Sequence, residues 1–139
     1  MSILDRLFKK KPAIELDDPV FRHITFDRGI WTFLPTKPED GFMIGVDAPE
    51  AGPSDQQRSL FSQVRSELPE YERRARDYMK SRVDHSVDVS RLSTYSVQVG
   101  NDDETRREEF VLELSDEDAF IVHRVSFAGG QPVDYGFDD

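Results

Sequence analysis

The stretch DPVFRHITFDRGIWTF, residues 18–33, is typical of a β-hairpin. Aromatic and β-branched residues on both sides of Asp27-Arg28-Gly29 favour two strands, and those three residues favour the turn between them. Ile30 and Trp31 are adjacent, so in a regular strand their side chains point to opposite faces of the sheet. We therefore expect one of the two to face away from the helices. If that residue is Trp31 and it is exposed, it is the best single candidate for contact with a partner; if it is buried, the hairpin is scaffold.

Outward from this hairpin, the pattern predicts a third strand over 42–47 and then two helices. Ser54 and Gln57 have the spacing of a capping box, and Pro69 suits the first turn of a second helix. The expected apolar face of the first helix is Leu60, Phe61, Val64 and Leu68, and that of the second is Tyr71, Ala75, Tyr78 and Met79, extended by Arg82. Each helix has one apolar face, which favours covering a sheet.

The last third of the chain returns to strand patterns over 92–99, 105–115 and 119–127, and the sequence AGGQP then indicates a closing hairpin. Short links between successive strands favour antiparallel pairing. The sequence therefore predicts an α+β fold: an antiparallel sheet of about six strands, in the order βββ-αα-βββ, with two helices packed on one face. Residues 1–17 are expected to be a short amphipathic segment and a linker, and residues 18–139 a single domain.

Composition favours a soluble domain in a reducing compartment. The chain has 139 residues, 11% of them aromatic, and it contains no cysteine. No apolar run reaches the roughly 18 residues that span a bilayer, and the start MSILDRLFKKKP lacks the features of a secretory signal. We expect a cytoplasmic protein. The first twelve residues could instead contact a membrane surface or a partner as a short amphipathic helix.

The net charge of −10 is concentrated in the predicted strand regions. Residues 83–139 carry four basic and fourteen acidic side chains, whereas residues 53–82 carry seven basic and five acidic ones. A protein that binds a phosphate backbone shows the opposite excess. Nucleic-acid binding is therefore disfavoured, with the helical middle of the chain as the one region where the charge would permit it.

No motif for catalysis is present. The sequence has neither a phosphate-binding glycine loop nor a nucleophile elbow, and its histidines, His23, His85 and His123, lack the spacing of a metal site. His123 is expected to be a buried, hydrogen-bonded histidine. We therefore predict no cofactor, no metal and no catalytic residue.

Two acidic turns are the remaining candidates for binding. Asp102, Asp103 and Glu104 form one of them, and Asp116, Glu117 and Asp118 form the other. They lie at opposite ends of one predicted strand, on the order of 30 Å apart, so they would not line a common pocket. They could frame an acidic face that attracts a basic protein. The ordinary alternative is that acidic turns keep a small domain soluble.

The opening hairpin, the sequence GVDAPEAGPSDQQRSLFSQV and the tail VDYGFDD together resemble a family of small uncharacterised bacterial proteins. Its members open with a D-P-x-F-G-x-[LI] hairpin that holds a tryptophan, and some resemble immunity proteins of toxin systems. This chain departs from the pattern at Arg22, where the family usually has glycine, so we expect the preceding turn to differ. The resemblance implies no functional residues.

Three functions are therefore carried forward. The first is a non-enzymatic binding protein of the bacterial immunity type, which would neutralise a basic toxin by covering it. The second is a small enzyme with a pocket near Trp31 and His123. The third is a membrane-surface or adaptor protein that acts through residues 1–12.

Overall fold

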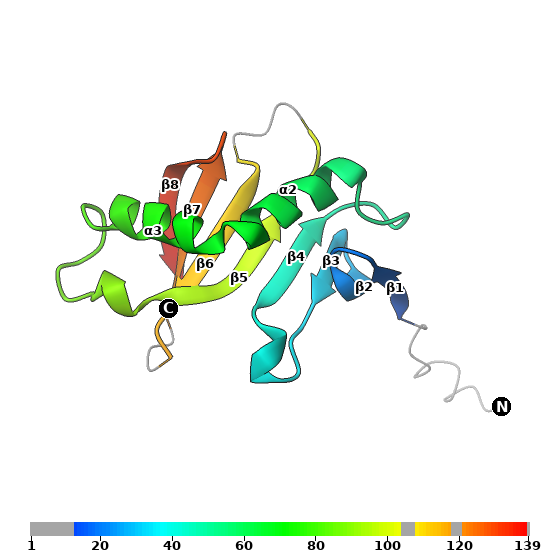
Figure 1. Ribbon diagram of the computed structural model, residues 1–139, viewed down its shortest axis with the longest axis horizontal. Helices are drawn as coiled ribbons and strands as arrows, with labels where there is room; N and C mark the ends of the chain where they lie inside the picture. Colours follow the sequence, from blue (N-terminus) through cyan, green and yellow to red (C-terminus); the bar gives the residue numbers. More distant parts are fainter. Residues whose placement is uncertain (1–12, 104–107, 118–120, 139) are drawn as a thin grey trace, which may run out of the picture.

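One sheet and two helices make up the α+β fold (Figure 1). The computed structural model describes residues 13–103, 108–117 and 121–138, so the amphipathic segment at residues 1–12 lies outside it. The eight strands are β1 (Ile14–Asp18), β2 (Arg22–Asp27), β3 (Ile30–Phe33), β4 (Met43–Asp47), β5 (Ser93–Val99), β6 (Phe110–Ser115), β7 (Val122–Ala128) and β8 (Gln131–Asp138). The helices are α2 (Asp55–Ser66) and α3 (Leu68–Met79), with short 3₁₀ turns at Pro38–Asp40 and Val89–Arg91.

The strands lie in the sheet in the same order as in the chain, so each of the two groups of four is an antiparallel meander. The meanders meet at β4 and β5, which pair in parallel. Two antiparallel neighbours can be joined by a tight turn, but parallel neighbours need a crossover, and here α2 and α3 supply it. The element order is thus ββββ-αα-ββββ.

The prediction of about six strands in the order βββ-αα-βββ was wrong, because each group has a fourth strand, β1 in the first group and β8 in the second. Residues 14–18 form the edge strand β1 and not a linker: Ile14 and Leu16 pair with Phe26 and Ile24 of β2. The expectation of a wholly antiparallel sheet missed the β4–β5 pair, because that register is set by the helices between the two strands. The mostly antiparallel sheet with two covering helices is confirmed.

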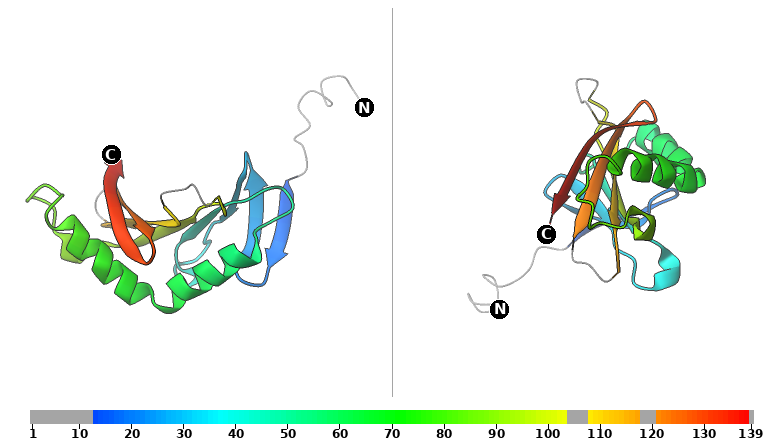
Figure 2. Two further views of the ribbon diagram at one scale, coloured as in Figure 1. Left: turned by 90° about the horizontal axis from the view of Figure 1, so that it is seen from above. Right: turned by 90° about the vertical axis from the view of Figure 1, so that its left-hand side faces the viewer.

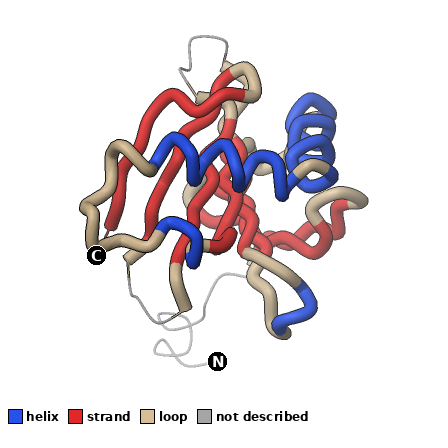
Figure 3. Tube along the Cα trace, turned by 60° about the vertical axis from the view of Figure 1, so that its left-hand side comes forward, coloured by secondary structure: helices blue, strands red, loops and turns tan. Residues whose placement is uncertain are grey.

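Both helices pack on one face of the sheet, as Figures 2 and 3 show from three directions. Phe61 and Val64 of α2 and Tyr71, Ala75 and Met79 of α3 are buried there. Tyr71 meets the rings of Phe110 and Phe127 edge-on, at centroid distances of 5.5 and 5.7 Å. The predicted apolar faces of the helices therefore cover the sheet and build the core, except that Arg82 lies beyond the end of α3 and is exposed.

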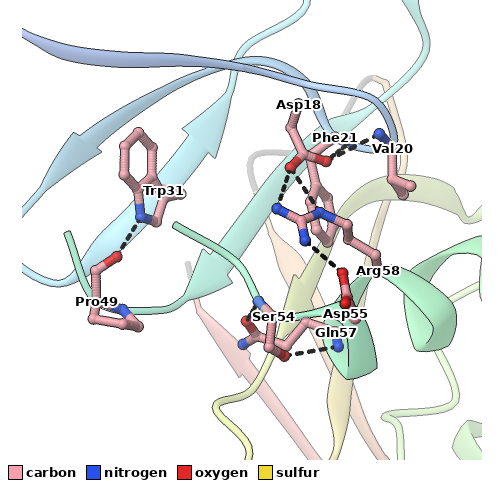
Figure 4. A network of polar contacts seen from close by, with 9 residues as sticks. All are labelled: Asp18, Val20, Phe21, Trp31, Pro49, Ser54, Asp55, Gln57 and Arg58. Carbon is pink, nitrogen blue, oxygen red and sulfur yellow. Dashed lines mark hydrogen bonds and ion pairs between the residues drawn. The ribbon is translucent and has the colours of Figure 1, made fainter. Parts of the chain in front are cut away.

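The opening hairpin also contributes to this core. Arg28 and Gly29 have φ values of 53° and 86°, the paired positive angles of the two-residue turn that matches the twist of a hairpin. Trp31 faces the helices, is only 1% exposed, and donates a 2.8 Å hydrogen bond from Nε1 to the carbonyl of Pro49 (Figure 4). Ile30 points to the other face and is 38% exposed. Trp31 is therefore scaffold, and its ring is not accessible to a partner.

The start of α2 fixes the parallel pair. Ser54 and Gln57 form the predicted capping box, each accepting the other's backbone N–H at 3.0 Å (Figure 4). The buried Gln57 amide also donates two 2.8 Å hydrogen bonds, to the carbonyl of Asp47 at the end of β4 and to that of Gly100 just after β5. One helix-capping side chain thus holds the ends of both parallel strands.

The turn between β1 and β2 is tied to α2 by a buried ion pair. The carboxylate of Asp18 accepts hydrogen bonds from the N–H groups of Val20 and Phe21 and from Arg58, at 2.8 to 3.0 Å (Figure 4). Burial alone would raise the pKa of Asp18, but these four donated bonds together lower it. The hydrogen-bonding capacity of the Asp18 carboxylate is used by the turn and by Arg58 of α2, which indicates that Asp18 has a structural role.

Candidate functional site

The face of the sheet opposite the helices carries a row of polar side chains across β5 to β8. Ser96 donates a 2.7 Å hydrogen bond to Glu113, which lies opposite it in the register. Arg124, the next residue along the row, contacts the other oxygen of Glu113 at 3.5 Å and pairs with Asp138 of β8. Ser96 is fully buried although neither α2 nor α3 lies on this face, and its hydroxyl is hydrogen-bonded to both Glu113 and Gln98. The row forms a fixed polar floor.

Gly45 allows this floor to continue onto β4. The side chain of Gln98 lies over Gly45, and a Cβ at position 45 would overlap the Gln98 carboxamide. From there Gln98 donates a 3.1 Å hydrogen bond to Ser96. The uncovered face is therefore flat and preorganised in its middle, where β4, β5 and β6 meet.

Exposed apolar side chains border this floor at both ends. Of the five large apolar residues that the described chain exposes, Ile30, Leu34 and Tyr95 lie here, whereas Ile14 and Phe137 lie on the edge strands. Leu34 and Tyr95 line a hollow of about 330 Å³, together with Met43 and Glu117. We call this the Tyr95 hollow. Ile30 lines a second hollow of about 170 Å³ at the opposite end of the same face.

A bulge in β5 creates the Tyr95 hollow. The β5–β6 register shifts between Thr94 and Ser96, which leaves Tyr95 without a partner of its own. Thr94 turns toward the helices, where its N–H and hydroxyl both donate to Glu72 of α3. Ser96 is held by Glu113 on the other face. Tyr95 is thus 47% exposed while its two neighbours are anchored.

Carboxylates surround the uncovered face on its outer strands. Glu15 and Asp17 of β1 and Asp134 and Asp138 of β8 alternate with residues that face the core. His23 lies between the first two, with Nδ1 2.6 Å from Asp17 and Nε2 3.4 Å from Glu15. Hydrogen bonds to Asp17 and then to Glu15 raise the pKa of His23. The outer strands therefore give this face an acidic rim.

The acidic turns predicted from the sequence lie at opposite ends of β6. Asp102 and Asp103 line a polar hollow of about 470 Å³ beside α2, and Glu104 lies outside the described residues. Asp116 pairs with Arg91 at 3.5 Å, and Glu117 lines the Tyr95 hollow.

Asp118, the last member of those turns, also lies outside the described residues. The structure therefore brings one of the predicted carboxylates, Glu117, to the uncovered face. It does not gather the two turns into one site.

Several cations on α3 are paired with neighbouring carboxylates. Arg73 contacts Glu70 at 2.6 Å and Asp77 at 2.8 Å, and Lys80 contacts Asp77 at 3.1 Å. The Arg73 guanidinium, followed by that of Arg74, lowers the pKa of Glu70 to about 2. Pairing of this kind offsets the positive charge of these side chains at the helix surface.

His123 is buried, as predicted, and is joined to the hydroxyl of Tyr135 by a 2.8 Å hydrogen bond. Burial lowers the pKa of His123. Trp31 lies on β3 and His123 on β7, four strand spacings away, or on the order of 19 Å. One small pocket would not include both residues, and neither lines any of the three hollows described above.

Comparison with protein-family models, with curated proteins and with solved structures found no match to this chain. In the part of the chain that the structure describes, no group of three or more His, Asp or Glu side chains is placed to hold a metal ion. Within the same ranges, no helix has both the length and the apolar character needed to cross a membrane.

Sequence reasoning missed the uncovered face as a unit. Its residues come from strands on both sides of the crossover, so their proximity depends on the parallel β4–β5 register. The exposed position of Tyr95 depends on the bulge, and strict alternation would group it with the core residues Val97 and Val99. The one available signal was Gly45, a glycine inside a strand pattern, which marks a close approach by another group.

Proposed function

We propose that this protein is a non-enzymatic binding protein that contacts a basic protein partner through the uncovered face of its sheet. The observation that carries the proposal is the placement of the exposed apolar residues Ile30, Leu34 and Tyr95 around this face. Exposed apolar side chains that a partner can bury, next to polar groups that can hydrogen-bond, are common components of a protein interface. The side chains of the floor between them are already hydrogen-bonded to one another, which limits the entropy lost on binding.

Charge supports the choice of a basic partner. The rim of this face is acidic and the chain as a whole carries a net charge of −10, so a basic protein would be attracted and oriented before contact. Within binding proteins, we propose the immunity type, in which an acidic protein covers a basic toxin. The alternative of an enzyme with a pocket near Trp31 and His123 gains no support from the separation of those residues.

Site-specific photo-crosslinking tests the face. A benzophenone amino acid replaces Tyr95 in the full chain in its native cell, and a second variant carries it at Phe137, which is 59% exposed on the edge strand β8. We expect a single basic protein to be crosslinked at position 95 and not at 137. The proposal is wrong if the two positions capture the same proteins to the same extent, or if position 95 captures none.

A further inference from the structure

The Tyr95 hollow combines an aromatic ring, aliphatic walls and a carboxylate. Tyr95 forms one wall, Leu34 and Met43 form others, and Glu117 lies at the rim. Among the described residues that line this hollow, none is Lys, Arg or His. Glu117 is exposed, and no ion pair within the described part of the chain engages its carboxylate.

We infer that this hollow receives an arginine side chain of the basic partner, an inference that rests on the proposed function. An aromatic face attracts a guanidinium by cation–π interaction, and a nearby carboxylate adds a charge-assisted hydrogen bond. The aliphatic stem of arginine would pack against Leu34 and Met43 while its charged end reaches Glu117. At about 330 Å³ the hollow is at the low end for small-molecule pockets and suits one long side chain.

Arginine fits this hollow better than lysine does. Its guanidinium is planar, stacks on aromatic rings and is more weakly hydrated than an ammonium group. Elsewhere in the same chain, Arg82 lies 3.6 Å over the ring of Tyr78 and Arg22 lies 5.2 Å over Phe33, so guanidinium stacking on partly buried aromatic rings is a contact this protein already makes. Tyr95 has no such cation in the described chain and is held ready by its anchored neighbours.

The experiment uses the full-length protein labelled with ¹⁵N and three blocked tripeptides with glycine on both sides of arginine, citrulline or lysine. Citrulline has the shape of arginine without its charge. We expect the arginine peptide to shift the amide signals of Met43, Tyr95, Ser115 and Glu117, the lysine peptide to bind more weakly, and the citrulline peptide to shift these signals little. Equal shifts with arginine and citrulline, or no localised shifts with arginine, overturn the inference.

Variants assign the two contacts. Glu117→Gln removes one exposed charge and is expected to weaken binding of the arginine peptide roughly two- to fivefold, the range for a surface ion pair. Tyr95→Leu removes the ring and is expected to weaken it by a similar factor. Glu50→Gln, an exposed carboxylate outside the hollow, is the matched control and should change nothing. An equal effect of the control overturns the assignment to Glu117, and the spectra themselves report whether each variant is folded.

The outcomes separate this inference from the proposed function. If position 95 captures a basic protein but the arginine peptide does not bind, the arginine subsite is wrong and the binding face stands. If the peptide binds but crosslinking captures no protein, the hollow recognises arginine and the proposed function fails.

Discussion

Arg22 has a backbone conformation that an L-residue rarely adopts. Its φ is 68°, at the end of the β1–β2 turn. Glycine adopts such a positive φ readily, whereas other residues do so only at a cost in strain. The guanidinium of Arg22 donates a 3.0 Å hydrogen bond to the carbonyl of Asp40 and stacks over Phe33.

A strand residue replaced by alanine usually gives a more stable protein than the same residue replaced by glycine. At position 22 we expect the opposite order of stability. Arg22→Ala loses both contacts and keeps the strain, whereas Arg22→Gly loses the contacts and relieves the strain. We expect the glycine variant to be more stable than the alanine variant by about 1 kcal/mol. Urea unfolding measures both, and the same pair at His23, a regular strand residue, is the control. At position 23 the alanine variant should be more stable than the glycine variant. If alanine is also the more stable at position 22, the proposed backbone strain at Arg22 is contradicted.

At the scale of elements, the contact between β4 and β5 joins the two meanders. Gly45 faces Gln98 across this pair, and the absence of a side chain at 45 gives the Gln98 amide room to reach Ser96. Gln57 closes one end of the same pair from α2. The two strands are thus coupled by side chains on both faces of the sheet.

A double-mutant cycle measures the coupling on the uncovered face. Gly45→Ala alone should destabilise the fold by about 1 kcal/mol, because it displaces Gln98 from Ser96 and outweighs the intrinsic gain of replacing a strand glycine. In the background of Gln98→Ala the obstruction is gone, so the same substitution should be neutral or stabilising. The measured quantity is the free energy of unfolding of the four proteins. Additive effects would contradict this account.

Short sequence patterns predicted the helices, the capping box and the hairpin turn well. Features that depend on contacts between distant segments were not predicted. The DRG turn, the Ser54–Gln57 capping box and the apolar faces of the helices are short patterns whose physics acts within a few residues. β1 was missed because Asp17-Asp18-Pro19 is typical of a linker, although Ile14 and Leu16 alternate as a strand does. The bulge at Tyr95 and the parallel register have no local signal, since both arise where distant strands meet.

At the scale of the molecule, fixed carboxylates determine how the fold responds to acid. Ion pairs or hydrogen bonds to backbone and serine donors lower the pKa of Asp18, Glu70, Asp77, Asp84 and Asp88. A carboxyl whose pKa is lower in the folded state contributes stability above its unfolded pKa of about 4 and loses it as the pH falls through the folded value. His23 acts in the opposite direction, but it is exposed and its contribution is small.

Asp18 should dominate the acid response because it is the buried member of this set. Asp18→Asn removes its charge opposite Arg58 and should lower the free energy of unfolding by about 2 kcal/mol at pH 7. The gap between wild type and variant should be constant above about pH 4 and should narrow below it, as the wild-type carboxylate is protonated. Urea unfolding from pH 7 to pH 2.5 measures this gap. A gap that stays constant to the lowest pH would contradict the lowered pKa of Asp18.

The parallel pairing of β4 with β5 has a consequence for the kinetics of folding. Within each meander most strand contacts join residues close in sequence, and these form quickly. Met43 and Ser96, by contrast, are paired across the whole helical segment, so closing that loop costs chain entropy before any packing is gained. We expect β4, β5 and α2 to form the folding nucleus, with the outer strands joining after the barrier has been crossed. Mutations such as Val97→Ala would then mainly slow folding, whereas mutations in β1 or β8 would mainly speed unfolding.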